Sequence, residues 1–318
     1  MTQVQSGWFQ TSNRTPTGQS KKIAVDNPYI TKDDFVSSVE ALGLGITNTH
    51  VLYTSGELDR LILIASGMIN KHCMRYFDTQ TIDETRTRFY VKPYNPELVT
   101  VVLKNRPFWK VNSIYIQVLQ WFIQVDVSTS GYLQEFSDYG YYKIVPLLSS
   151  AGTGANSPIP AAILDRQPLG VLWTNYTFGY GVPQTSITLT ADATKKIYTA
   201  PVGYRLWAPD QTTTIYSNGV AVTPASIDYA NGVVTFTNSQ TTNVITADFI
   251  SNESIPADIK EACKLLVSYL IGQALQNPAG ASSYSIQTFS ISFSGDNQVL
   301  KRAHDILESY VNNIPQVI

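Results

Sequence analysis

The sequence predicts an α+β protein, in which a core of long helices and a C-terminal helix carries an antiparallel β region and an inserted all-β domain. Three observations support this fold class. Apolar residues recur at helical spacing in two stretches, residues 57–77 and 255–276. Much of the sequence between them is rich in β-branched and aromatic residues, broken by Pro, Asn and Gly. Two Asn-Gly pairs, at 218–219 and 231–232, lie between β-prone residues and predict hairpins of a small sandwich or barrel.

These patterns divide the chain into four segments. Residues 1–28 are polar and lack periodicity, which indicates an extended N-terminal arm. Residues 29–183 contain the first helices of the core and then the β region. Residues 184–250 form the inserted all-β domain. Residues 251–318 return to the core with C-terminal helices, a β-arm and a tail.

Helix-end signals place the first two helices. Over residues 31–45, Thr31 can cap the N-terminus with Asp34 reciprocating, and Gly43 or Gly45 can end the helix. Ser55 is the expected N-cap of a second helix from Glu57 to Phe77. This helix carries LILIASGMI, an apolar run that is hydrophobic on nearly all sides and therefore needs cover from other parts of the protein.

The C-terminal part of the core begins with a helix that Ser254 can cap and that has Pro256 in its first turn. Six residues at three-to-four spacing give it one apolar face: Ile259, Ala262, Cys263, Leu266, Val267 and Leu270. An alternating segment near 284–294 follows and predicts a strand-like arm. Apolar residues lie on both of its faces, so it needs cover on two sides.

The charge content restricts the classes of function. Only 14% of the residues are charged and the net charge is −2, so the chain lacks the basic footprint of a duplex-binding protein. A surface of Tyr, Thr, Ser and Asn suits a subunit covered by partners, and it equally fits a β-rich fold. The sequence predicts neither a signal peptide nor a transmembrane helix.

Catalytic, cofactor and metal sites are not predicted. Cys73 and Cys263 lie outside any CxxC pair and are interpreted as buried free thiols. The three histidines form no HxH or HExxH pattern, and His72 and Cys73 diverge on a helix. Dispersed acids such as Glu135 and Asp138 are the weak alternative, a hydrolase with two converging carboxylates. The many aromatic residues are interpreted as core and interface fillers rather than a stacking platform for sugars or bases.

Three motifs, in this order, resemble the head–tail connector (adaptor) proteins of tailed bacteriophages. The first ends the apolar helix and is matched by Cys73, Arg75 and Phe77. The second is a strand pair around LKNRPFWKVNSIYI, and the third is a helix that begins with a P-x-D-I-K-x-A pattern. The second is matched by Leu103, Pro107, Val111 and Ile114, and the third by Pro256, Asp258, Ile259, Lys260 and Ala262. The segment 184–250 departs from the smaller members of that family, which lack it.

The resemblance implies a structural virion protein without catalysis. Such a protein forms a homo-oligomeric ring, typically of twelve subunits, below the portal protein, and it is assembled in the cytoplasm of the bacterial host. The ring extends the DNA channel, through which DNA passes without sequence-specific binding, and it offers a docking surface to neck, tail-terminator or tail-completion proteins. The apolar run of the 57–77 helix would then be covered by its own domain on one side and by a neighbouring subunit on the other.

Two sets of residues are expected to make the contacts of such a ring. Apolar and aromatic residues of the 284–294 arm are the candidate subunit interface: Tyr284, Ile286, Phe289, Ile291 and Phe293. The C-terminal tail supplies the candidate portal-docking residues: Ile314, Pro315, Val317 and Ile318. The N-terminal arm is the alternative for this contact. The alternative function is a phage tail or receptor-binding protein that uses the 184–250 domain to bind a receptor or glycan.

Overall fold

The computed structural model describes ten stretches of the chain. These are residues 9–12, 23–85, 88–92, 95–118, 121–125, 133–136, 141–144, 170–240, 243–276 and 298–311. They fold into two compact units, each formed by segments that are far apart in the sequence. Unit 1 comprises 1–25 and 80–179, and unit 2 comprises 26–79 and 180–318.

Unit 1 consists of antiparallel sheets in its described residues. A five-stranded sheet has the order β1-β6-β5-β9-β2 and a four-stranded sheet the order β3-β4-β8-β7. The strands of the first sheet are β1 (Phe9–Ser12), β2 (Gln80–Thr85), β5 (Phe108–Val118), β6 (Trp121–Val125) and β9 (Gly170–Phe178). Those of the second are β3 (Arg88–Lys92), β4 (Asn95–Val102), β7 (Leu133–Phe136) and β8 (Tyr141–Ile144). Residues 9–12, within the segment expected to be an extended arm, thus form an edge strand paired with β6.

The β module of unit 2 is the stretch from 182 to 251. One sheet has the order β10-β17-β13-β14 and the other β11-β12-β16-β15. The first contains β10 (Val182–Thr188), β13 (Thr214–Ser217), β14 (Val220–Val222) and β17 (Ile245–Ser251). The second contains β11 (Thr190–Ala191), β12 (Ile197–Thr199), β15 (Ser226–Asp228) and β16 (Val233–Thr235). Side chains from both sheets form one core that includes Trp207 stacked on Phe249, with ring centroids 4.2 Å apart.

Both predicted hairpins are present. Asn218 and Gly219 have φ values of 50° and 82° and connect β13 to β14, as a two-residue hairpin turn requires. The second pair, Asn231-Gly232, ends the connection between β15 and β16. In that connection Asp228 accepts hydrogen bonds from the backbone N–H groups of Ala230 and Asn231.

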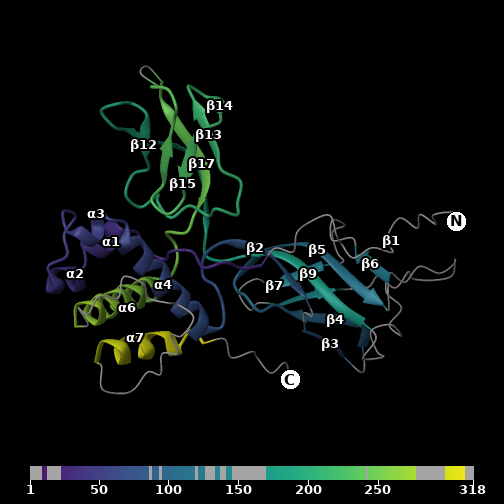
Figure 1. Cartoon of the computed structure of the whole chain (residues 1–318). Helices are drawn as coiled ribbons and strands as arrows, with labels where there is room; N and C mark the ends of the chain where they lie inside the picture. Colours follow the sequence, from purple (N-terminus) through teal and green to yellow (C-terminus); the bar gives the residue numbers. More distant parts are fainter. Residues whose placement is uncertain are drawn as a thin grey trace. The chain divides into compact units, whose positions relative to one another are not determined.

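Unit 2 also contains a helical region. Its helices come from two parts of the sequence, before and after the β segments between residues 80 and 251. It contains α1 (Lys32–Val36), α2 (Val39–Leu44), α3 (Val51–Thr54), α4 (Glu57–Cys73), α6 (Ala257–Gln276) and α7 (Gln298–Glu308). These helices gather around one hydrophobic core (Figure 1). The six residues expected on the apolar face of α6 are all buried. Of the apolar run in α4, Ile62, Ala65 and Ile69 are buried, whereas Leu63 remains exposed.

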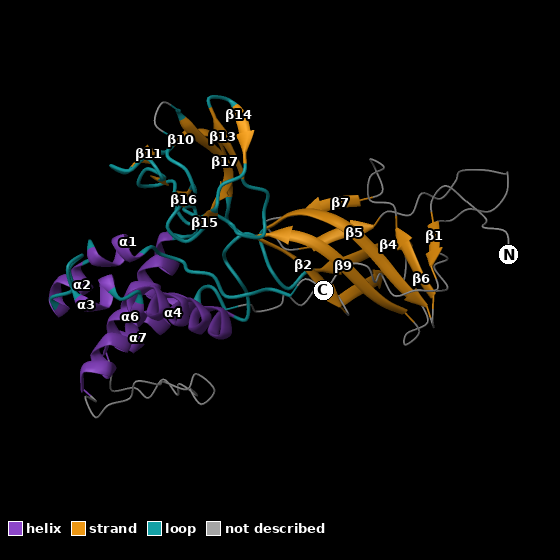
Figure 2. Cartoon of the chain, turned by 45° about the horizontal axis from the view of Figure 1, so that its top comes forward, coloured by secondary structure: helices purple, strands orange, loops and turns teal. Residues whose placement is uncertain are grey.

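The predicted fold class is wrong. The described chain is mostly antiparallel sheet (Figure 2), and only three of its six helices have seven or more residues. One reason is that the helix predicted over 31–45 is two short helices, because Ser37 caps the end of α1 and the Ser38 hydroxyl accepts from the Ala41 N–H of α2. Strands occupy most of the described residues between 80 and 251, so the helices do not form a long-helical core.

Helix ends were predicted with mixed success. The Thr31–Asp34 capping box is present at α1. The N-cap of α4 is Gly56 rather than Ser55, which instead caps the end of α3. At its other end α4 stops at Cys73, four residues earlier than predicted, because Met74 has a left-handed backbone with φ 55°.

Candidate functional site

The predicted interface residues lie outside the part of the chain that the structure describes. The arm residues Tyr284, Ile286, Phe289, Ile291 and Phe293 lie outside the described residues, as do Ile314, Pro315, Val317 and Ile318 of the tail. Of the two dispersed acids, Asp138 also lies outside them, and the side chain of Glu135 in β7 is not described. The candidate site is therefore built from the residues of unit 2 that carried the sequence motifs.

Two of the three connector-like motifs meet in the core of the helical region, although about 180 residues separate them in the sequence. Cys73 and Phe77, at and after the end of α4, share this core with Ile259 and Ala262 of α6. Ser66 of α4 lies with its Oγ 3.7 Å from Cys263 Sγ of α6. Four of the matched positions of the first and third motifs thus belong to one packed core, whereas the matched residue Asp258 is exposed.

Aromatic rings surround Phe77. Its centroid lies 5.9 Å from that of Tyr29, 6.2 Å from that of Tyr180 and 5.7 Å from that of Tyr310, just after α7. The Arg75 guanidinium lies 4.6 Å from the Phe77 centroid and 5.6 Å from that of Tyr310. Because Arg75 is 6% exposed, this cation–π contact is largely desolvated and holds the C-terminal part of the chain against the end of α4.

The residues preceding α1 are fastened to α4 by buried polar groups. The Tyr29 hydroxyl donates to Asn70 and accepts from the Phe77 N–H, and the Tyr29 N–H donates to Ser66 Oγ at 3.1 Å. Asn70 also donates to Asp26 Oδ1 at 2.7 Å. Burial raises the pKa of Tyr29 well above its usual value, so its hydroxyl stays a hydrogen-bond donor. Tyr29, Ser66 and Asn70 thus satisfy one another's hydrogen bonds inside the core, and exposed Asp26 adds a contact at its edge.

The two cysteines are buried free thiols, as predicted. Burial raises the pKa of each thiol to about 12. Because the thiolate is the nucleophilic form of cysteine, neither residue is activated for covalent catalysis.

Glu84 of β2 is a half-buried acid in unit 1. Burial raises its pKa, although it accepts hydrogen bonds from the Tyr176 hydroxyl at 2.7 Å and the Lys104 N–H at 3.1 Å. Its hydroxyl partner is itself buried, with a raised pKa. The Glu84–Tyr176 pair contains a single carboxylate, whereas the hydrolase alternative requires two that converge.

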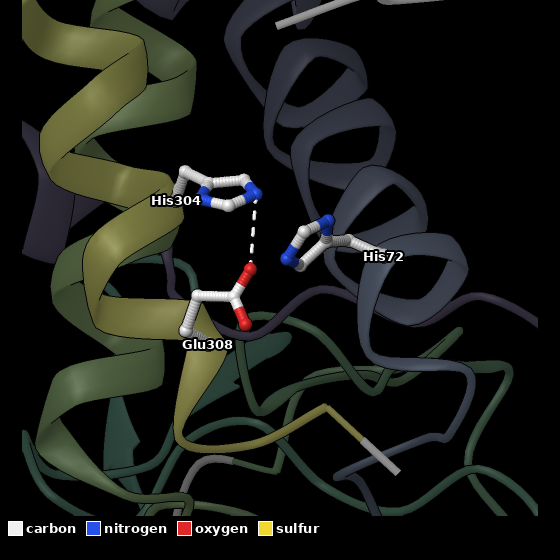
Figure 3. A group of neighbouring side chains, drawn as sticks. All are labelled: His72, His304 and Glu308. Carbon is white, nitrogen blue, oxygen red and sulfur yellow. Dashed lines mark ion pairs between the residues drawn. The ribbon is translucent and has the colours of Figure 1, made fainter. Parts of the chain in front are cut away.

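One cluster of potential metal ligands is found among the described residues. It consists of His72 near the end of α4 and of His304 and Glu308 on α7, whose ligand atoms all lie within 4.8 Å of one another. Figure 3 shows the two side chains of α7 facing His72. His304 Nε2 lies 3.2 Å from Glu308 Oε1, and the two imidazole centroids are 4.7 Å apart. Burial lowers the pKa of His72, and the neighbouring His304 lowers it further.

The sequence analysis missed this cluster because His72 and His304 are 232 positions apart. The signal that could have found half of it is the i, i+4 spacing of His304 and Glu308, which places both side chains on one face of a helix. Nothing in the sequence indicated that α7 would pack beside the end of α4.

Comparison of the chain with protein-family models, curated proteins and solved structures found no match. Among the described helices, none combines the length and hydropathy that crossing a membrane would require.

Proposed function

We propose that this chain is a structural protein of tailed-bacteriophage virions that assembles as a ring at the head–tail junction. In this role it binds the portal protein on one side and neck or tail proteins on the other, and DNA passes through its channel. What supports the proposal most is that four matched positions of the first and third connector-like motifs pack in one core although the motifs are distant in sequence. These positions are Cys73, Phe77, Ile259 and Ala262.

The low net charge of the chain fits this role. A net charge of −2 over 318 residues gives little attraction for phosphate, which favours free passage of DNA over retention. A surface with few charges also suits head-to-tail contacts repeated around a closed ring. Both cysteine thiols are buried and protonated, so neither supplies a nucleophile.

The receptor-binding alternative gains no support from the pocket of the β module. This pocket, of about 420 Å³, lies between β13, β14 and β15. Threonine, serine and aliphatic residues line it, among them Thr213, Thr223, Ser226 and Ile227. Its lining contains neither an aromatic side chain for stacking on a sugar nor a charged group.

Electron microscopy of the purified full-length chain, alone and mixed with its cognate portal protein, tests the proposal. We expect closed rings with a central opening in at least the mixture, because ring closure can depend on the portal. Trimers or single globular particles in both samples would refute the ring. Native mass spectrometry of the same samples gives the number of subunits.

Two deletions assign the contacts within that assembly. Removing residues 284–294 should abolish rings, because the arm carries apolar residues on both faces and needs cover. Removing residues 312–318 should leave rings intact and weaken capture of the portal. If rings persist without the arm, the arm is not the subunit interface. Far-UV circular dichroism of each deletion variant verifies that it remains folded.

A further inference from the structure

We propose that His72, His304 and Glu308 form a binding site for a divalent transition-metal ion, with Zn²⁺ the best fit, which links α7 to the end of α4. The inference rests on the geometry of these three side chains alone. It is independent of the ring proposed above, since a metal could link these helices in a subunit of any assembly.

The distances are close to those that a metal imposes. Zinc–ligand bonds of about 2.0–2.1 Å in a tetrahedral site place neighbouring ligand atoms roughly 3.3 Å apart. His304 Nε2 and Glu308 Oε1 are already 3.2 Å apart. Since all three ligand atoms lie within 4.8 Å of one another, a side-chain movement of about 1.5 Å at His72 would complete the three-ligand set.

The donor types select the class of metal. Two imidazole nitrogens and one carboxylate oxygen suit zinc and its neighbours in the first transition row, whereas Ca²⁺ and Mg²⁺ prefer sites made of oxygen atoms. Three protein ligands leave a fourth position of the tetrahedron for water. His304 and Glu308 are partly exposed, with 33% and 57% of their side-chain surfaces accessible, so an ion can enter from solvent.

The backbone supports the site on two helices. His304 and Glu308 are one helical turn apart on α7, which packs onto the core through Leu300, Ala303 and Leu307. His72 is the penultimate residue of α4. Ligands on regular, packed helices are held more precisely than ligands on loops, and this favours binding without rearrangement of the chain. A bound ion would therefore add a cross-link to contacts that already exist.

Metal titration of the full-length chain, produced without a histidine tag and stripped with EDTA, tests the site. Calorimetry with Zn²⁺ should give one ion per chain, and Co²⁺ should produce the visible absorption of a four-coordinate centre. With free zinc at about a hundredfold above Kd, the melting temperature of the helical region should rise by roughly 5 °C. Absence of saturable binding would overturn the proposal.

Variants assign the ligands. His72→Ala and His304→Ala should each weaken zinc binding by about a hundredfold or more, and Glu308→Gln by about tenfold. His50→Asn is the matched control, because His50 is the remaining histidine and its Nδ1 caps α3 by accepting from the Leu52 N–H, a task that Asn can perform. It should bind zinc like the unmodified chain.

Folding is checked in EDTA by far-UV circular dichroism. Glu308→Gln keeps the test decisive if a histidine variant unfolds, because the Glu308 side chain is mostly exposed and its amide replacement is nearly isosteric. Zinc binding that survives Glu308→Gln and both histidine substitutions with unchanged affinity would show that the ion binds elsewhere.

Discussion

Gly181 lies immediately before β10, where the chain enters the β module, and its backbone passes very close to buried Thr79. A Cβ atom at this position would lie 2.2 Å from Thr79 Oγ1 and 2.5 Å from Ile250 Cγ2. The Gly181 N–H donates to the same hydroxyl at 2.7 Å, and the Thr79 N–H donates to Asn252 Oδ1 at 2.9 Å. Only glycine allows this approach, because any side chain would force the hydrogen-bonded backbone apart.

Gly181→Ala should therefore destabilise unit 2. We expect a loss of about 1–3 kcal/mol in the free energy of unfolding, the usual cost of an overpacked site, with some loss of the hydrogen bond to Thr79. Urea unfolding followed by Trp fluorescence measures this change. An unchanged midpoint would mean that the chain around Gly181 can shift without cost.

Gly43→Ala is the matched control for this substitution. Gly43 is exposed in α2 and a Cβ atom there would have no neighbour within 4 Å. Alanine in place of an exposed helical glycine should stabilise the chain by roughly 0.5–1 kcal/mol. Opposite signs for the two substitutions would separate close packing from a general effect of glycine replacement.

At the scale of elements, α7 is held to the helical region by one apolar face and by Tyr310. The ring of Tyr310 packs edge-on against Phe77, and its hydroxyl donates to Asp258 Oδ2 of α6 at 3.3 Å. The pair Arg302–Glu261 adds a contact at 3.2 Å between an exposed guanidinium and a half-buried carboxylate. Exposed ion pairs contribute little, so we attribute the docking of α7 mainly to the apolar face and the tyrosine ring.

Substitutions of Tyr310 can separate the ring from the hydroxyl. Tyr310→Ala should lower the free energy of unfolding by about 2–3 kcal/mol, because it removes the ring that contacts both Phe77 and Arg75. Tyr310→Phe should cost under about 1 kcal/mol, since it removes only a long hydrogen bond to an exposed acid. Tyr204→Ala, at an exposed tyrosine of the β module, is the control. Equal costs for Ala and Phe at 310 would contradict the role of the ring.

Local patterns predicted several elements because the deciding interactions are close in sequence. The Thr31–Asp34 box, the turn at Asn218-Gly219 and the apolar face of α6 depend on residues a few positions apart. The break between α1 and α2 was missed because Ser37 and Ser38 can either continue a helix or cap its ends. The proportion of sheet was underestimated because strand pairing between distant segments has no local signal.

The candidate metal cluster is the clearest case of a feature that sequence could not predict. His72 offers no ligand-forming pattern with its neighbours, and its partners are brought to it only by the packing of α7 beside α4. The i, i+4 spacing of His304 and Glu308 is frequent on solvated helices and indicates an ion pair as readily as a ligand pair. Tertiary structure was needed to choose between these interpretations.

At the scale of the whole molecule, the helical region and the β module of unit 2 are joined by an ion pair as well as by the chain. Arg205 of the module donates to Asp33 Oδ2 in α1, and the Tyr53 hydroxyl donates to Asp33 Oδ1 at 2.5 Å. Burial alone would raise the pKa of Asp33, but the hydrogen bonds from Tyr53 and Arg205 outweigh it and hold the pKa below 3.8.

The sign of the pH effect follows from this lowered pKa. A carboxyl group whose pKa is lower in the folded than in the unfolded state contributes stability above the unfolded pKa of about 4. That contribution is lost as the pH falls through the folded pKa. Because the Asp33 side chain is 46% exposed, solvent screening limits the contribution to roughly 0.5–1 kcal/mol.

Asp33→Asn should therefore destabilise the chain at neutral pH and have progressively less effect in acid. We expect the difference in unfolding free energy from the unmodified chain to be constant above about pH 5 and to shrink below about pH 4. Urea unfolding at a series of pH values measures it, with Trp207 reporting on the module. Asp210→Asn, which removes an acid from an exposed turn of the same module, is the control for general charge effects. A difference that grows as the pH falls would contradict the assigned direction of the Asp33 shift.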